Sequence, residues 1–168
     1  MAARDSSMQP FVVSREFNAP RALVWQAWTD PERLKKWWGP KGFTVFHCKV
    51  DLRPGGSFHY GMRTPEGKEV WGKFLYEEVK KPERLTFIVM FSDASGGTTR
   101  HPFNAEWPQR THSTVLFAEK NGRTTVTVRW LPAEGSSDVE RKTFDDGRAS
   151  MQQGWGGTLD QLEAYLGT

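Results

Sequence analysis

The part of the chain that decides the fold is its last thirty residues, SDVERKTFDDGRASMQQGWGGTLDQLEAYL (residues 137–166). Ser136, Ser137 and Asp138 at its start are good helix N-cap residues. The apolar residues then recur at steps of three, four or seven, which predicts one stripe along a helix; they are Phe144, Met151, Trp155, Leu159, Leu162 and Leu166. We therefore expect a helix over about 138–166. A helix this long needs a broad apolar partner to cover its stripe.

Trp155 lies in the middle of this stripe and has three glycines beside it, Gly154, Gly156 and Gly157. Each glycine costs about 1 kcal/mol relative to alanine in a helix interior, so another requirement must favour them. Two explanations stay open. The glycines let a neighbouring backbone approach closely, or they leave space beside the indole, or a weak point in the helix, that a ligand uses.

The rest of the chain consists mainly of short segments in which apolar and polar residues alternate, as expected for half-buried strands. The expected strands cover 11–17, 46–50, 58–62, 70–79, 85–91, 115–117 and 126–130. Two short helices follow the first strand, one after Pro20 and one starting at Pro31. Asn121-Gly122 is a strong hairpin turn. The sequence predicts an α+β fold, with a seven-stranded antiparallel sheet around the long C-terminal helix.

Residues 92–111 form a long polar stretch without a strand pattern, and Phe103 and Trp107 lie inside it. A loop of about twenty residues without structure of its own is unusual in a compact domain and tends to be functional or disordered. We expect a mobile lid in which the two aromatic residues become buried.

Composition excludes several classes of protein. A length of 168 residues indicates a single domain over residues 11–168, after a flexible polar tail over 1–10. The net charge of +3 is dispersed, which argues against nucleic-acid binding. The single cysteine, Cys48, excludes an internal disulfide and a cysteine-based zinc site. No apolar run has the length of a membrane span and residues 1–10 lack the core of a signal peptide, so we expect a cytoplasmic protein.

Several sequence blocks, in their order, resemble the START-like (SRPBCC) superfamily, and within it the family homologous to the activator of the heat-shock protein 90 ATPase. They are Asn18-Ala19-Pro20, Val24-Trp25-Gln26-Ala27-Trp28-Thr29-Asp30-Pro31, Trp37-Trp38-Gly39-Pro40, Asp51-Leu52-Arg53-Pro54-Gly55-Gly56, Pro82-Glu83-Arg84-Leu85, Gly154-Trp155 and Leu159-Asp160-Gln161-Leu162. The resemblance implies a helix-grip fold, in which a curved antiparallel sheet holds the C-terminal helix with a cavity between them. It implies no catalytic motif.

The residues that commonly carry chemistry give weak signals here. His47 and His59 fall on the polar side of their strands, so we expect them to face solvent and not a metal. His101 and His112 flank the long loop; His101, beside Phe103, is either an exposed loop residue or an acid or base at a cavity mouth. Cys48 is expected to be buried and inert. We identify no catalytic residue, no metal site and no cofactor motif.

The stronger signal is an excess of aromatic residues, which make up 13% of the chain and include eight Trp. Any one of them can simply fill the core, but as a group they suggest the lining of an apolar pocket with a few polar handles. The handles are Tyr60 and the indole N–H groups. The candidate ligand-binding residues are Trp37, Trp38, Phe58, Tyr60, Trp71, Phe91, Phe103, Trp107, Trp130, Met151 and Trp155.

Three hypotheses for function follow. The first is binding of a small hydrophobic or aromatic molecule between the sheet and the C-terminal helix. The second is an enzyme of the same fold, cyclase-like or hydrolase-like, acting on an aromatic or polyketide-like substrate through Tyr60, His101 or an arginine. The third is a co-chaperone-like interaction module with a chaperone partner. The first is favoured, for a monomer or a homodimer without a cofactor.

Overall fold

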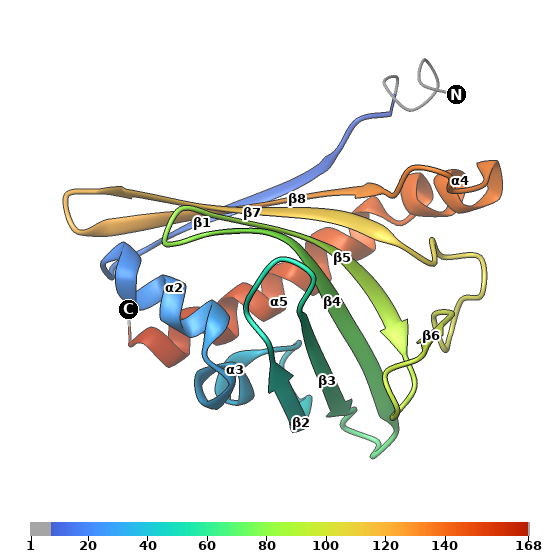
Figure 1. Cartoon of the computed structure of the whole chain (residues 1–168), viewed down its shortest axis with the longest axis horizontal. Helices are drawn as coiled ribbons and strands as arrows, with labels where there is room; N and C mark the ends of the chain where they lie inside the picture. The colour runs from blue at the N-terminus through green and yellow to red at the C-terminus, as the bar shows by residue number, and fades with distance from the viewer. Residues whose placement is uncertain (1–7, 168) are drawn as a thin grey trace.

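The structure is a computed structural model that describes residues 8–167 (Figure 1). One antiparallel sheet curves around the helices, in the strand order β1-β8-β7-β5-β4-β3-β2, with the short β6 paired to β5. The strands are β1 (Phe11–Phe17), β2 (Thr44–Val50), β3 (Ser57–Arg63), β4 (Glu69–Lys80), β5 (Arg84–Ser92), β6 (Thr98–Thr99), β7 (Thr111–Lys120) and β8 (Arg123–Pro132). The helices are α2 (Arg21–Thr29), α3 (Pro31–Trp37), α4 (Asp138–Asp146) and α5 (Arg148–Leu166). This arrangement confirms the predicted α+β helix-grip fold and adds β6 to the seven expected strands.

The turns and caps are those that local sequence chemistry favours. Asp30 caps α3, because its carboxylate accepts a hydrogen bond from the Glu32 backbone N–H at 3.0 Å. Asn121 and Gly122 both have positive φ, 55° and 77°, as a tight two-residue hairpin requires. These elements were predictable because each is determined by neighbouring residues.

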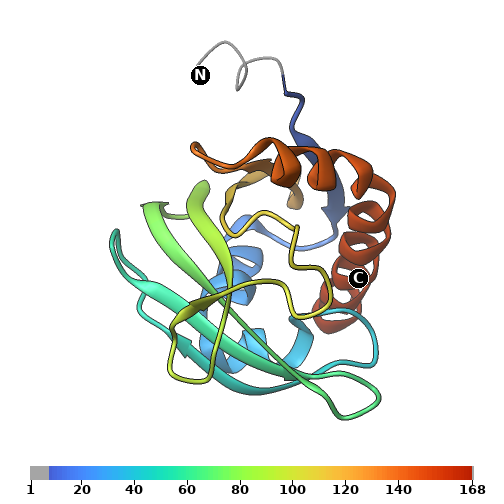
Figure 2. The same cartoon turned by 90° about the vertical axis from the view of Figure 1, so that its right-hand side faces the viewer.

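The inner face of the sheet and one side of α5 form the core. Figure 2 shows the sheet curled around the interior, with α5 on the opposite side. The stripe predicted for the helix is buried at Met151, Trp155, Leu159 and Leu162. Arg15 of β1 ties α5 to the sheet edge with a salt bridge of 2.5 Å to Asp160.

The prediction of a single helix over 138–166 is wrong in one respect, because the helical segment is divided at Gly147 into α4 and α5. The Gly147 N–H caps α4 by donating to the carbonyls of Thr143 and Phe144, both at 3.1 Å. Its φ and ψ of −92° and 9° lie outside the helical region. A Cβ at this position would lie 2.9 Å from Trp107 Cζ3, so the ring of Trp107 occupies the space that a side chain would need.

The stretch over 92–111 is more ordered than expected. It contains β6, and a turn in which Asp93 Oδ1 accepts the backbone N–H groups of Ser95 at 2.9 Å and Gly97 at 2.8 Å. Expecting no structure here was wrong, because a two-residue strand is too short to produce a periodic pattern.

Residues 1–7 of the expected flexible tail lie outside the described residues. Of its last three residues, Gln9 accepts a hydrogen bond from Arg148 Nη2 at 2.6 Å through its carbonyl. Among the described helices, none combines the length and apolar character needed to cross a membrane.

Candidate functional site

Two adjoining pockets, together called the cavity, lie between α5 and the inner face of the sheet. The α5 lobe has a volume of about 250 Å³ and the loop lobe about 290 Å³. The α5 lobe is lined by Trp38, Gly39, Pro40, Tyr60, Met62, Val70, Phe74, Val89, Phe91, Trp130, Met151, Gly154, Trp155 and Thr158. The loop lobe is lined by Tyr60, Val89, Met90, Phe91, His101, Trp107, Pro108, Thr111, Trp130, Ser150 and Met151. Five lining residues are common to both lobes, so the two volumes are neighbours.

Seven of the eleven candidate residues line this cavity, and they come from separate parts of the chain. They are Trp38, Tyr60, Phe91, Trp107, Trp130, Met151 and Trp155. Five of the thirteen other lining residues are apolar residues of the strands: Met62, Val70, Phe74, Val89 and Met90. Strand alternation points to Val89, which lies two residues before Phe91 and so on the same face of β5.

The other four candidates lie elsewhere, which corrects their assignment to the pocket. Trp37 is 1% exposed and its indole N–H donates to the Ala27 carbonyl at 2.8 Å, so it holds α3 against α2. Phe58 is fully buried in the core, where its ring packs against Phe74 at 5.0 Å. Phe103 is 63% exposed and lines neither lobe.

Trp71, the fourth, lies on the outer face of the sheet. Its neighbours in β4, Val70 and Gly72, are buried, and alternation turns Trp71 to the other side. There its ring stacks on His59, with ring centroids 5.3 Å apart, and contacts His47 at the same distance. The two histidines therefore face outward as expected, but against an aromatic ring that partly covers them.

Trp155 lines the α5 lobe. Its ring is 8% exposed and meets Trp28, Trp38 and Trp130, with centroids 6.1, 6.0 and 5.6 Å away. Apart from the chain neighbours and the adjoining backbone of α5 itself, no described atom lies within 4 Å of where a Cβ would stand on Gly154, Gly156 or Gly157. The explanation that the glycines let a neighbouring backbone approach closely is therefore wrong. The explanation that they leave open space beside the helix is consistent with this geometry. Only Gly154 of the three lines the cavity.

The loop lobe is closed on one side by His101 and Trp107. The His101 ring packs on Phe91 with centroids 4.5 Å apart, and Trp107 packs on Phe144 of α4 at 5.7 Å. His101 Nδ1 accepts a hydrogen bond from the Phe103 backbone N–H at 3.0 Å. Burial lowers the pKa of His101, which favours the neutral imidazole. Sequence reasoning weighed His101 without choosing it, because a loop histidine has no periodic pattern that places it.

The cavity is apolar and its few polar groups are neutral. Within the part of the chain that the structure describes, neither lobe is lined by an Asp, Glu, Lys or Arg residue. Burial raises the pKa of Tyr60, so its hydroxyl stays protonated. This hydroxyl lies over Gly72, where a Cβ would collide with it. The Trp130 indole N–H donates to Ser113 Oγ at 2.9 Å.

Other chemistry receives little support. Cys48 is half-buried, and burial raises the pKa of its thiol to about 11, which disfavours the reactive thiolate. Across residues 8–167, no group of three or more His, Cys, Asp or Glu side chains is arranged to hold a metal ion.

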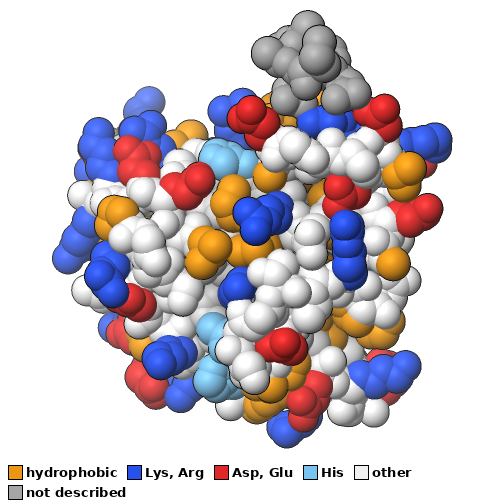
Figure 3. Space-filling model, turned by 45° about the vertical axis from the view of Figure 1, so that its right-hand side comes forward, with side chains coloured by type: hydrophobic (Ala, Val, Ile, Leu, Met, Phe, Trp, Pro, Cys, Tyr) orange, Lys and Arg blue, Asp and Glu red, His pale blue; other side chains and the backbone are white. Residues whose placement is uncertain are grey.

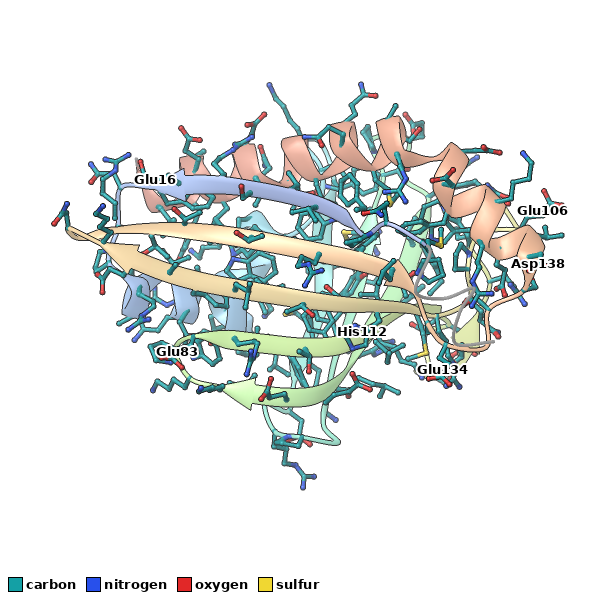
Figure 4. The ribbon with its side chains drawn as sticks, turned by 90° about the horizontal axis from the view of Figure 1, so that it is seen from above. Glu16, Glu83, Glu106, His112, Glu134 and Asp138 are labelled. Atoms are coloured by element: carbon teal, nitrogen blue, oxygen red, sulfur yellow. The ribbon has the colours of Figure 1, made fainter. Side chains whose placement is uncertain are left out.

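A second hollow of about 520 Å³ lies on the outer face of the sheet. It differs in character from the cavity, because five of its lining residues are charged or titratable: Glu77, Arg110, His112, Glu134 and Arg141. His112 Nε2 lies 3.1 Å from Glu77 Oε1. Seen from above, His112 lies over the middle strands, and Glu134 lies where the chain leaves β8 for α4 (Figure 4). Figure 3 shows hydrophobic side chains reaching the surface among charged ones.

Comparison with known proteins agrees with this architecture. The sequence profile of the family described as "Activator of Hsp90 ATPase homolog 1-like protein" matches residues 18–167. A search among curated proteins finds no significant match. A solved protein from Nitrosomonas europaea is 28% identical, with 94% of this chain and 93% of that chain covered and a TM-score of 0.73.

Two further solved structures are similar over nearly the whole chain. A protein from Mycobacterium smegmatis is 28% identical, covering 92% of this chain and 88% of its own, with a TM-score of 0.72. A protein from Arthrobacter aurescens is 26% identical, covering 97% and 88%, with a TM-score of 0.77. With the profile match over residues 18–167 and the helix-grip fold, the chain belongs to the Activator of Hsp90 ATPase homolog 1-like family of the START-like superfamily.

Proposed function

We propose that this protein binds a small apolar or aromatic molecule in the cavity between α5 and the sheet. The observation that carries the proposal is the lining: rings of Trp38, Trp130 and Trp155 and the side chain of Met151 surround a space with no charged side chain among the described residues. Apolar space of this kind is poorly filled by water and favours apolar ligands. A START-like fold is consistent with ligand binding.

The size of the cavity limits the ligand. Small-molecule sites in proteins commonly occupy about 300–1,000 Å³. The two lobes, of about 250 and 290 Å³, lie at or below the lower end of this range. A ligand of two or three fused rings fits one lobe, and a longer one reaches past Tyr60 into the other.

The enzymatic alternative rests on His101. It is a neutral imidazole in the loop lobe, as a general base requires. Tyr60 also lines each lobe. Among the described residues, however, no Asp or Glu lines either lobe, so no carboxylate is placed to assist the histidine. Binding therefore requires fewer assumptions than catalysis.

The co-chaperone alternative predicts an exposed apolar surface. Among the described residues, the exposed large hydrophobic side chains are Val12, Leu75, Phe103 and Val139. They belong to β1, β4, the loop before β7, and α4, so they come from four separate parts of the chain. The interior volume gives ligand binding the stronger support.

The proposal is tested with a substitution on α5 whose side chain fills the α5 lobe. Gly154→Leu places a side chain in the lobe, and leucine favours a helix more than glycine does. Gly156→Leu is the matched control, since its Cβ also meets open space but Gly156 lines neither lobe. The probe is the neutral dye N-phenyl-1-naphthylamine, followed by its fluorescence.

We expect the dye to bind the wild type and the control alike, and Gly154→Leu to weaken binding about tenfold or more, since filling the lobe removes the area the ring would bury. Equal dye affinity in Gly154→Leu and Gly156→Leu would refute binding in the cavity. Native mass spectrometry of freshly purified protein would identify a molecule that copurifies.

A further inference from the structure

Two residues that line the cavity carry hydrogen-bond donors for which the described part of the chain supplies no acceptor. The first is the hydroxyl of Tyr60, a residue that lines both lobes. A polar neighbour of this hydroxyl is the Trp38 indole N–H, and Trp38 itself is 9% exposed. The geometry between them leaves Trp38 Nε1 without a satisfactory hydrogen bond among the described residues.

The direction of the Tyr60 hydrogen follows from the chemistry of indole. An indole N–H is only a donor, so the Tyr60 hydroxyl can accept from Trp38 but cannot donate to it. The hydroxyl hydrogen is therefore left for a partner in the cavity. A ligand acceptor there would accept this hydrogen and so satisfy a buried donor that otherwise has no acceptor among the described residues.

The second donor is His101. Because Nδ1 accepts the Phe103 N–H at 3.0 Å, the proton of the neutral ring resides on Nε2. No hydrogen bond from Nε2 is found among the described residues, and His101 lines the loop lobe. The Trp130 N–H, in contrast, is already satisfied by Ser113 Oγ at 2.9 Å.

The walls add two further requirements. An ionised ligand would lose its hydration without gaining a counter-charge, since no charged side chain lines either lobe in the described chain. The flat rings of Trp38, Trp130, Trp155 and Phe91 favour a planar ring system, which stacks on them or meets them edge to face.

We propose that the cavity selects neutral planar aromatic molecules with a carbonyl oxygen, and that this oxygen accepts a hydrogen bond from the Tyr60 hydroxyl. This inference rests on the proposed function. A second acceptor at the other end of the ligand would meet His101 Nε2–H in the loop lobe.

The test compares two probes of the same shape, 9-fluorenone and fluorene, which differ in a carbonyl and a methylene group. Quenching of tryptophan fluorescence gives the dissociation constant of each probe, and the measured quantity is the ratio of the two constants. Comparing this ratio between variants cancels the difference in hydration between the probes, because that difference is the same for every variant. Tyr60→Phe removes only the hydroxyl. Tyr76→Phe is the control, since Tyr76 is a buried tyrosine that lines neither lobe.

We expect Tyr60→Phe to reduce the preference for fluorenone about fivefold, as the loss of one net hydrogen bond predicts, and Tyr76→Phe to leave it unchanged. An unchanged ratio in Tyr60→Phe, with both probes bound, would overturn the carbonyl contact while leaving the proposed function intact. If neither probe binds the wild type, the proposed function fails as well.

A third probe, 9-fluorenone-4-carboxylate, tests the requirement for a neutral ligand. It should bind about tenfold more weakly than fluorenone or worse, because its charge enters a cavity without a counter-ion. Equal or tighter binding of the carboxylate would contradict this part of the inference. Denaturant melts of each variant confirm that the compared proteins are folded.

Discussion

Glu140 of α4 holds the backbone of Gln109, whose N–H donates to Glu140 Oε2 at 2.8 Å. The same oxygen accepts a hydrogen bond from Arg100 Nη1 at 2.6 Å. The other oxygen, Oε1, accepts the Ser137 N–H at 2.9 Å and so completes the capping box of α4. One carboxylate thus joins the start of α4 to both ends of the segment 100–109, which contains His101 and Trp107 of the loop lobe. In Figure 2 this segment crosses in front of the interior, between the sheet and the helices.

Replacing Glu140 by alanine should loosen both elements at once. We expect a loss of about 1–2 kcal/mol in the free energy of unfolding, from the lost cap and the lost bonds to the segment 100–109. Hydrogen exchange at residues 100–110 should become faster, and a bound dye should slow it less than in the wild type. Asp146→Asn is the control, because Asp146 lies on the same helix and its carboxylate pairs with the exposed Lys142. Unchanged exchange in Glu140→Ala would show that the segment is held by other contacts.

The same carboxylate predicts a dependence on pH. Burial opposes its charged form, but hydrogen bonds from Ser137, Gln109 and Arg100 outweigh burial and lower the pKa of Glu140 below its usual value. A group whose pKa is lowered by folding stabilises the fold above its unfolded pKa, about 4.3, and this contribution disappears as the pH falls through the folded pKa. The stability difference between wild type and Glu140→Gln should therefore be constant near neutral pH and shrink in acid. Denaturant melts at a series of pH values measure it, and a difference that grows in acid would contradict the sign.

Gly147→Ala should move Trp107. The added Cβ would lie 2.9 Å from Trp107 Cζ3 and 3.3 Å from the Thr143 carbonyl oxygen, so its most severe conflict is with the ring. The φ of −92° at Gly147 is itself open to alanine. We expect destabilisation by about 1–3 kcal/mol through overpacking. The control Gly157→Ala, with open space around its Cβ, should stabilise α5 by about 0.5–1 kcal/mol.

Dye binding and the near-ultraviolet circular dichroism of tryptophan would report the displacement in Gly147→Ala. The double variant Gly147→Ala/Trp107→Leu should recover part of the lost stability, because the smaller side chain no longer meets the new methyl group. Failure of this rescue would mean that the glycine is needed for its position between the two helices.

Trp155→Ala should affect stability and binding together. Its ring meets three other tryptophans and also lines the α5 lobe, so its removal enlarges a space that is already partly empty. We expect a loss of about 3 kcal/mol, near the lower end for a large aromatic residue in a core, with weaker dye binding per folded molecule. Denaturant melts paired with dye titration separate the two effects. A large stability loss with unchanged dye affinity would assign Trp155 to the core alone.

The sequence by itself determined the elements whose causes are local. The apolar stripe from Met151 to Leu162, the alternation in the strands and the Asn121-Gly122 turn each depend on residues a few positions apart. The outward position of Trp71 was also available from the sequence, since Val70, Phe74 and Tyr76 mark the opposite face. The prediction that Trp71 lines the pocket did not take this alternation into account.

Only the tertiary structure decided which aromatic side chains face a cavity. Trp37 and Trp38 are adjacent, yet one bonds to the Ala27 carbonyl in the core and the other lines the α5 lobe. The division at Gly147 likewise depends on Trp107, forty positions away, and the free donor on His101 depends on the bend that brings the Phe103 N–H to its ring. A cavity is space that packing leaves unfilled, so it is a property of side chains that meet from distant segments, and no local pattern records it.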